Sequence, residues 1–220
     1  MQQSYFHYLT NQVQLKIETE LSINPIEHLA AETFTSRIDD LSSRQFHAFY
    51  LQYTRHPEAI HQEPQFFRLF KQRYSLQGIP NTTLDEWERD KPEIIRQLMD
   101  NPFEGYLRFF HQRTFVFAES SREKSMTSFF TKLLHTLRPD EYSALDNPIR
   151  KLLGLKKESF FYSYCIINTA YQQFISNNSP FLQQLRHQLN DMDSAGVLEE
   201  PLLSSYKLLD MIFWWKANRS

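Results

Sequence analysis

The amino-acid sequence predicts an all-α fold, a compact multihelical domain of about ten helices with no significant sheet. Apolar residues recur at spacings of three and four along most of the 220-residue chain, as on the buried face of a helix. Only 4 glycines occur, which disfavours a fold made of tight β-turns and excludes glycine-rich phosphate loops. Several β-branched residues are present, but they never form a sustained alternating pattern.

The composition indicates a globular protein with a sizeable core, since 41% of the residues are hydrophobic and 15% are aromatic. Large rings fill the gaps between crossing helices. We expect an N-terminal helical layer (1–80), a linker-like helical segment (81–104) and a C-terminal helical core (105–220). The alternative is that all three form one domain.

The N-terminal layer is predicted to contain four helices. The first has one apolar stripe, formed by Phe6, Leu9, Val13, Ile17 and Leu21. Pro25 opens a second helix, IEHLAAETFTSRI, and Ser42 or Ser43 is a plausible N-cap for a third. The stretch FFRLFKQRY (66–74) is the fourth, and the turn around Gly78 ends the layer.

The segment 81–104 carries three breaks at Pro or Asn and many charges. Thr83 and Glu86 have the spacing of a capping box, in which a hydroxyl and a carboxylate each accept a free backbone N–H. We therefore expect a helix to begin at Thr83.

The C-terminal core is predicted to be more regular. Residues 106–117 indicate a helix, although TFVF alone could be a short strand. A helix over 124–137 has an apolar face of phenylalanines and leucines. The run FFYSYCIINTAYQQFI is apolar nearly all round and is predicted to be the central, buried helix. FLQQLRHQLNDM and LLSSYKLLDMIFWWKA are expected to be amphipathic helices.

The stretch ALDNPIRKLLGL (144–155) predicts a short capped helix. Asp146 is placed to be its N-cap, with the carboxylate accepting N–H groups of the first turn. Pro148 suits the first turn because its missing N–H would have no partner there. Gly154 then ends the helix in the left-handed conformation.

The net charge of −2 excludes a polyanion-binding role for the chain as a whole, but residues 121–157 are locally basic. On the helix predicted over 124–137, Lys124, Ser128, Thr131, Lys132 and His135 lie opposite the phenylalanines. We expect Arg122, Lys124, Lys132, Arg150 and Lys151 to contact the phosphates of a nucleic acid. The alternative is that these cations are ordinary residues of solvent-exposed helix faces and bind no ligand.

The segment Lys124 to Leu155 resembles the second half of the helix-hairpin-helix DNA glycosylase core. In this resemblance Asp146 matches the catalytic aspartate, which stabilises the cationic sugar as the base departs, and Arg150 follows on the next turn. Lys124 stands near the catalytic lysine of bifunctional members, and His135 is a further candidate assistant. The Gly-x-Gly hairpin of that family is replaced by SREKSMTSF.

A second resemblance is to uncharacterised bacterial proteins with the pattern S-K-x-L-H-x-x-x-P…D-x-x-[VI], ending in L-x-x-[LI]-D-x-x-x-W. Here the first part is Thr131 to His135, Pro139, Asp146 and Ile149, with Thr131 in place of serine. The second part is Tyr206 to Trp214. This resemblance implies a helical fold and no known chemistry.

Asp210 is expected to anchor the last helix, or to share a pocket with Asp146 or His135. Cys165 is expected to be a buried structural thiol, since nothing basic stands beside it. No cofactor and no metal are predicted, and no apolar segment is long enough to span a membrane. The first residues lack the pattern of a signal peptide, so we expect a cytoplasmic protein.

Three functions therefore remain open. The first is a nucleic-acid-associated protein that acts in DNA repair or phage defence. The second is a non-enzymatic helical module that binds a protein partner. The third is a haem-oxygenase-like, metal-dependent oxidase, for which His56, Glu58, His61 and Glu63 form the relevant cluster.

Overall fold

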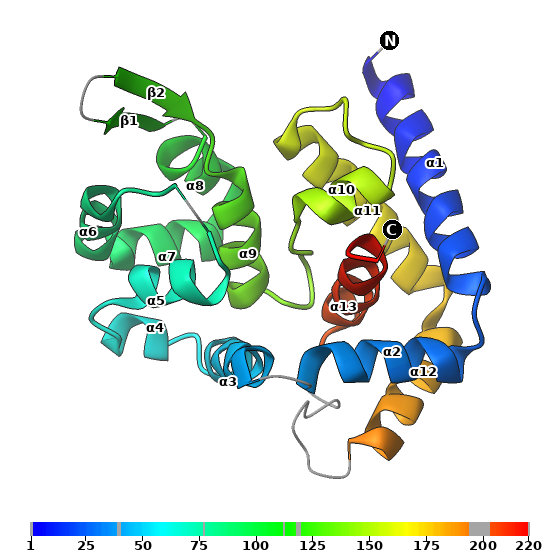
Figure 1. The fold of residues 1–220 in the computed structure, drawn as a ribbon. Coiled ribbons are helices and arrows are strands. Elements are labelled where there is room, and N and C mark those ends of the chain that lie inside the picture. The colour runs from blue at the N-terminus through cyan, green and yellow to red at the C-terminus, as the bar shows by residue number, and fades with distance from the viewer. Residues whose placement is uncertain are drawn as a thin grey trace. The chain divides into compact units, whose positions relative to one another are not determined.

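The computed structural model describes residues 2–38, 41–76, 78–111, 113–117, 120–193 and 203–219. Within these ranges the chain forms thirteen helices and one two-stranded β-hairpin (Figure 1). The predicted all-α class is confirmed, and the hairpin is a small addition to it. None of the described helices is long and apolar enough to span a membrane.

The chain divides into two units. Unit 1 comprises residues 1–47 and 139–220, and unit 2 comprises residues 48–138. The boundaries therefore fall at 47/48 and 138/139, whereas the segments predicted from the sequence divide at 80/81 and 104/105. Helix α3 (Leu41–Arg55) carries the chain from unit 1 into unit 2.

Unit 1 combines the N-terminal helices with the last four. These are α1 (Gln2–Ser22), α2 (Ile26–Ile38), α10 (Asn147–Leu152), α11 (Phe160–Asn177), α12 (Ser179–Met192) and α13 (Ser205–Ala217). Helix α1 packs along α11, and α2 contacts both α12 and α13 (Figure 1). The apolar stripe predicted on α1 is confirmed at its C-terminal half, where Val13, Ile17 and Leu21 are buried.

The most buried helix of unit 1 is α13, in which every residue from Tyr206 to Phe213 is buried. The apolar pattern of the sequence instead favours the run 160–175 as the central helix. That run forms α11, which buries only one side. The difference arises because α13 buries Lys207 and Asp210 as an ion pair. Charged residues in the sequence of α13 therefore do not indicate a solvent-exposed face.

Unit 2 contains the remaining helices. These are α4 (Ala59–Gln62), α5 (Phe66–Arg73), α6 (Asn81–Arg89), α7 (Lys91–Asp100), α8 (Pro102–Phe109) and α9 (Thr127–Leu137). Its core is aromatic. The ring of Phe129 on α9 lies 4.8 Å from Trp87 and 4.9 Å from Phe70, measured between ring centroids. Such ring contacts favour close helix crossings, as the aromatic content predicted.

Unit 2 has more helices than expected, and they are shorter, because prolines begin new helices. Pro92 and Pro102 lie in the first turns of α7 and α8, where a proline needs no N–H partner. Helix α6 begins at Asn81 with Pro80 as its N-cap, and no side-chain hydrogen bond caps it. The predicted capping box of Thr83 and Glu86 is therefore wrong, and Thr83 lies buried inside the first turn.

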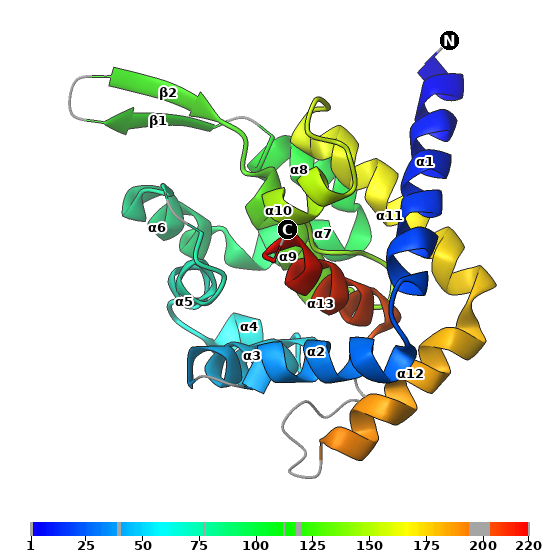
Figure 2. The ribbon, with the colours of Figure 1, turned by 45° about the vertical axis from the view of Figure 1, so that its right-hand side comes forward.

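The β-hairpin joins α8 to α9. Helix α8 ends at Phe109, β1 (Arg113–Phe117) follows, and β2 (Ser120–Lys124) pairs with it in antiparallel register. Figure 2 shows the two strands extending away from the helices of unit 2. The helix predicted over 106–117 is thus too long, and the alternative of a strand at TFVF is confirmed.

Candidate nucleic-acid interface

The register of the hairpin brings basic and aromatic residues together. Arg113 pairs with Lys124, Phe115 with Arg122, and Phe117 with Ser120. Residues paired in this way, and those two positions further along a strand, belong to the same face of a hairpin. One face is therefore made of Arg113, Phe115, Phe117, Ser120, Arg122 and Lys124, and we call it the hairpin face.

The register sets two cations, Arg113 and Lys124, directly opposite each other. Like charges placed directly opposite each other on antiparallel strands repel. The other face carries the acid, Glu123, at the position opposite Thr114. The cations and the acid of the hairpin thus stand at alternating positions of the strands, which belong to opposite faces.

Helix α9 does not present the polar face that was expected of it. It begins at Thr127, so Lys124 belongs to β2 and not to the helix. Thr131, Lys132 and His135 are buried, with 0%, 4% and 0% of their surface exposed. The predicted solvent-facing side of this helix is wrong, because its polar side chains are buried and contact Tyr50 and Tyr74.

The buried polar side chains of α9 bind other parts of unit 2. Lys132 donates to Ser128 Oγ at 3.2 Å, and its ammonium lies 5.9 Å from the centre of the Tyr74 ring. His135 Nε2 and the hydroxyl of Tyr50 are 3.1 Å apart. These contacts give Lys132 and His135 a place in the core, where a phosphate does not reach them.

Asp146 occupies the N-cap position of α10, as the sequence predicted. Its carboxylate, however, accepts no capping hydrogen bond, so that part of the prediction is wrong. Its backbone carbonyl accepts the N–H of Arg150 at 3.0 Å, and Pro148 lies in the first turn. The predicted stop is confirmed, since Gly154 has a φ of 83°.

Arg150 holds the loop that follows α10. Its Nε donates to the carbonyl of Leu155 at 3.2 Å, its Nη2 to that of Lys156 at 2.8 Å, and its Nη1 to Asn147 Oδ1 at 3.3 Å. Lys151 on the same helix is exposed. Of these two residues predicted to contact phosphate, Arg150 stabilises the loop after α10, and Lys151 is exposed at the surface.

The predicted basic region therefore divides between the units. Arg122, Lys124 and Lys132 belong to unit 2, and Arg150 and Lys151 belong to unit 1. The predicted catalytic residues divide in the same way, with Lys124 and His135 in unit 2 and Asp146 in unit 1. Of the predicted cations of unit 2, Arg122 and Lys124 lie on the same strand of the hairpin.

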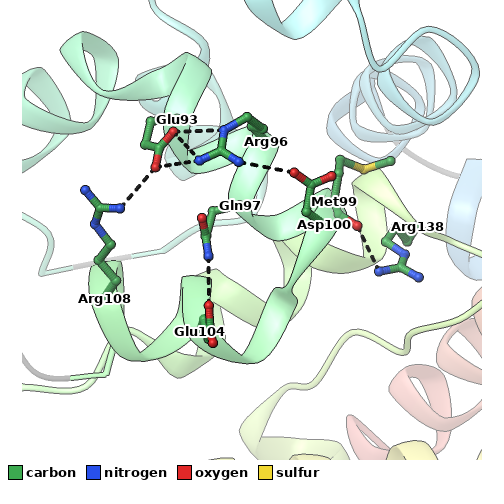
Figure 3. A network of polar contacts seen from close by, with 8 residues as sticks. All are labelled: Glu93, Arg96, Gln97, Met99, Asp100, Glu104, Arg108 and Arg138. Atoms are coloured by element: carbon green, nitrogen blue, oxygen red, sulfur yellow. Dashed lines mark hydrogen bonds and ion pairs between the residues drawn. The ribbon is translucent and has the colours of Figure 1, made fainter.

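Other arginines of unit 2 are bound by acceptors of the protein (Figure 3). Glu93 accepts from Arg96 Nη2 at 2.8 Å and from Arg108 Nη1 at 3.0 Å. The hydrogen bonds from Arg96, followed by the charges of Arg96 and Arg108, lower the pKa of Glu93. Arg138 Nη1 donates to the carbonyl of Met99 at 3.2 Å. These arginines form polar contacts with neighbouring acceptors of unit 2.

Asp210 lies in unit 1 and is 6% exposed. Its Oδ2 accepts from Lys207 Nζ at 3.0 Å, one turn away on α13. Burial, followed by the charge of Asp210, raises the pKa of Tyr171 well above its usual value. This ion pair joins two residues of the same helix, so the expected anchoring of α13 by Asp210 stays a prediction.

Within the described ranges, no group of three or more His, Cys, Asp or Glu side chains is placed to hold a metal ion. Of the predicted cluster, His56 Nδ1 lies 3.2 Å from Glu58 Oε1, and the hydroxyl of Tyr53 donates to Glu63 at 3.5 Å. The short helix α4 and its flanks therefore contain local polar contacts.

Comparison with known proteins adds no relative. No family model, no curated protein and no solved structure matches the chain. The resemblances to the glycosylase core and to the bacterial helical proteins stay predictions.

Proposed function

We propose that this protein binds nucleic acid through the hairpin face. The observation that carries the proposal is the register that sets Arg113 opposite Lys124 and Phe115 opposite Arg122. Cations of this kind contact phosphates, and phenylalanines stack on bases. A two-stranded ribbon combines both on one surface.

The aromatic component favours single strands or unpaired regions, because only unstacked bases expose a ring face to a side chain. A β-ribbon also fits the major groove of duplex DNA, so a duplex is the natural comparison ligand. The proposal concerns binding only, since His135 is buried and Lys124 and Asp146 belong to different units.

A salt-dependent titration tests this proposal. Labelled single-stranded and duplex oligonucleotides are titrated with the whole chain, and binding is followed by fluorescence anisotropy between low and physiological salt. Three cations contacting a single strand predict a slope of about −2 for log K against log salt, because each phosphate contact contributes roughly −0.7. Absence of binding at low salt, in a folded protein, would refute the proposal.

That refuting outcome would leave the protein-interaction module as the candidate. Exposed apolar residues of unit 2 can be tested for it. Met99, Phe103 and Leu107 on α7 and α8 are large apolar residues with 42%, 56% and 48% of their surface exposed. Exposed apolar groups of this size are the features by which partner surfaces are recognised.

A further inference from the structure

A cavity of about 310 Å³ lies between α5 and α6 of unit 2. Its lining consists of Arg68, Lys71 and Gln72 from α5 and Asn81 and Leu84 from α6. This set comprises two cations, two amides and one apolar side chain, and it includes no acid. Such a lining suits a small anion.

Lys71 contributes a positive charge to the cavity, and its hydrogen bond to the protein does not neutralise that charge. Its ammonium donates to the carbonyl of Ile79 at 2.7 Å, which is a neutral acceptor. A lysine ammonium carries three N–H donors, so this bond fixes the side chain and leaves donors for a ligand. Because Lys71 is only partly exposed, water screens its charge less than that of a surface lysine.

Arg68 is held in position from the other helix. Its Nε and Nη2 both donate to Asp85 Oδ1, at 3.2 and 2.5 Å. A guanidinium has five N–H donors in a rigid plane, and these two bonds leave the others for an acceptor. The ion pair therefore fixes the direction of the guanidinium across the α5–α6 boundary.

The first turn of α6 adds to the positive potential of the cavity. Asn81, the first residue of this helix, lines the cavity, and no side chain caps the helix at Pro80. Backbone N–H groups at a helix start lack intrahelical partners and favour negative charge. This effect is secondary to that of Lys71 and Arg68.

We propose that this cavity binds the phosphate group of a small phosphomonoester. Lys71 and Arg68 would contact the phosphate oxygens, and the remaining volume would hold the organic part. The volume lies at the lower end of the range for small-molecule sites, so it has room for more than a phosphate ion. The site goes beyond the proposed function, because it takes a single ligand and uses no residue of the hairpin face.

Calorimetric titration of the whole chain tests the ligand class. The probes are inorganic phosphate, a nucleoside 5′-monophosphate and the same nucleoside without phosphate. Saturable binding of both phosphates, and none of the nucleoside, is expected. Binding of the nucleoside alone, or of none of the three, would overturn the proposal.

Substitutions at Gln72 give the sharpest check, because this exposed amide lines the cavity and its side chain forms no hydrogen bond among the described residues. Gln72→Glu should weaken phosphate binding and Gln72→Lys should strengthen it, with unchanged thermal unfolding of both. Equal affinities of the two variants would contradict the site. Lys71→Gln should weaken binding by about tenfold or more, the loss of one charge-assisted hydrogen bond.

Two further experiments are needed. One identifies the molecule that carries the phosphate, and the other distinguishes this proposal from binding at the hairpin face. Competition by a 5′-phosphorylated oligonucleotide, but not by its unphosphorylated form, would identify a strand end as the ligand. Competition by neither form would identify the free phosphomonoester. An Arg122→Glu/Lys124→Glu variant should retain phosphate binding, so failure of the hairpin proposal leaves this result intact. Loss of phosphate binding in that variant would contradict an independent cavity.

Discussion

Lys207 and Asp210 form an ion pair inside unit 1, with 3.0 Å between Nζ and Oδ2 and side-chain exposures of 2% and 9%. The ammonium of Lys207 also lies 5.2 Å from the centre of the Phe46 ring. Taking two charges out of water is costly, and the pair compensates each of them. The pair explains how α13 can be buried along most of its length.

The first prediction concerns this pair. Asp210→Leu leaves the ammonium of Lys207 buried without its carboxylate and should lower the free energy of unfolding by about 3–5 kcal/mol. The double variant Lys207→Met/Asp210→Leu should recover most of this loss, because neither charge is then buried. Urea unfolding of both variants measures the difference. A double variant no more stable than Asp210→Leu would contradict the assignment.

The second prediction concerns Lys132, which the sequence pattern places on a phosphate-binding surface. Because this residue is 4% exposed, Lys132→Glu should unfold or destabilise unit 2 by about 3 kcal/mol or more, as expected for a buried, uncompensated charge. The exposed Lys151→Glu is the matched control and should stay within about 0.5 kcal/mol of the wild type. Equal stability of the two variants, measured by circular dichroism on heating, would contradict the burial of Lys132.

The third prediction concerns Gly154, which has a φ of 83° and open space, with no atom within 4 Å, where the Cβ of another residue would lie. The penalty for a side chain is therefore conformational and not steric crowding. Gly154→Ala should lower stability by about 1–2 kcal/mol. Gly154→Asn should lower it less, since asparagine tolerates the left-handed region. Denaturant midpoints of the two variants compare these costs, and an alanine variant as stable as wild type would contradict the turn.

The fourth prediction concerns the reactivity of Cys165. Burial raises the pKa of this thiol to about 11, so the thiolate is scarce at pH 8. Alkylation of the folded protein should then be on the order of a hundredfold slower than that of a free cysteine. Because the unfolded chain loses this proton at lower pH, the contribution of Cys165 to stability is complete below its usual pKa and is lost as pH rises towards 11. Rapid alkylation at pH 8 would contradict this.

The helices of this protein could be predicted from local patterns, and the burial of several of their polar side chains could not. The stripe ending at Leu21 and the stop at Gly154 follow from spacing and backbone preference, which act locally. Lys132, His135 and Lys207 look like surface residues in the sequence. The burial of Lys132 and His135 depends on Tyr74 and Tyr50, which only the folded chain brings close. Lys207 instead pairs with Asp210, one turn away on the same helix.

The hairpin shows the same limit at the candidate site. RTFVF and SSREK are five-residue segments separated by two residues, and the first is rich in β-branched and aromatic residues, which is a hairpin signal. Local charge alone is enough to select Arg122 and Lys124. From the sequence alone, Arg113, Phe115 and Phe117 were missed. Their pairing with these cations depends on the strand register, and a helix predicted over 106–117 has no such register.

The most direct test of the central proposal is a fluorescence anisotropy titration that compares two charge reversals. Arg122→Glu/Lys124→Glu changes the hairpin face, and Lys156→Glu/Lys157→Glu makes the same charge change at exposed positions of unit 1. We expect the hairpin variant to bind a single-stranded oligonucleotide at least about tenfold more weakly than wild type at low salt, since two phosphate contacts are lost. The unit 1 variant should stay close to wild type. Equal affinities of the two variants would contradict the proposal that the hairpin face binds nucleic acid.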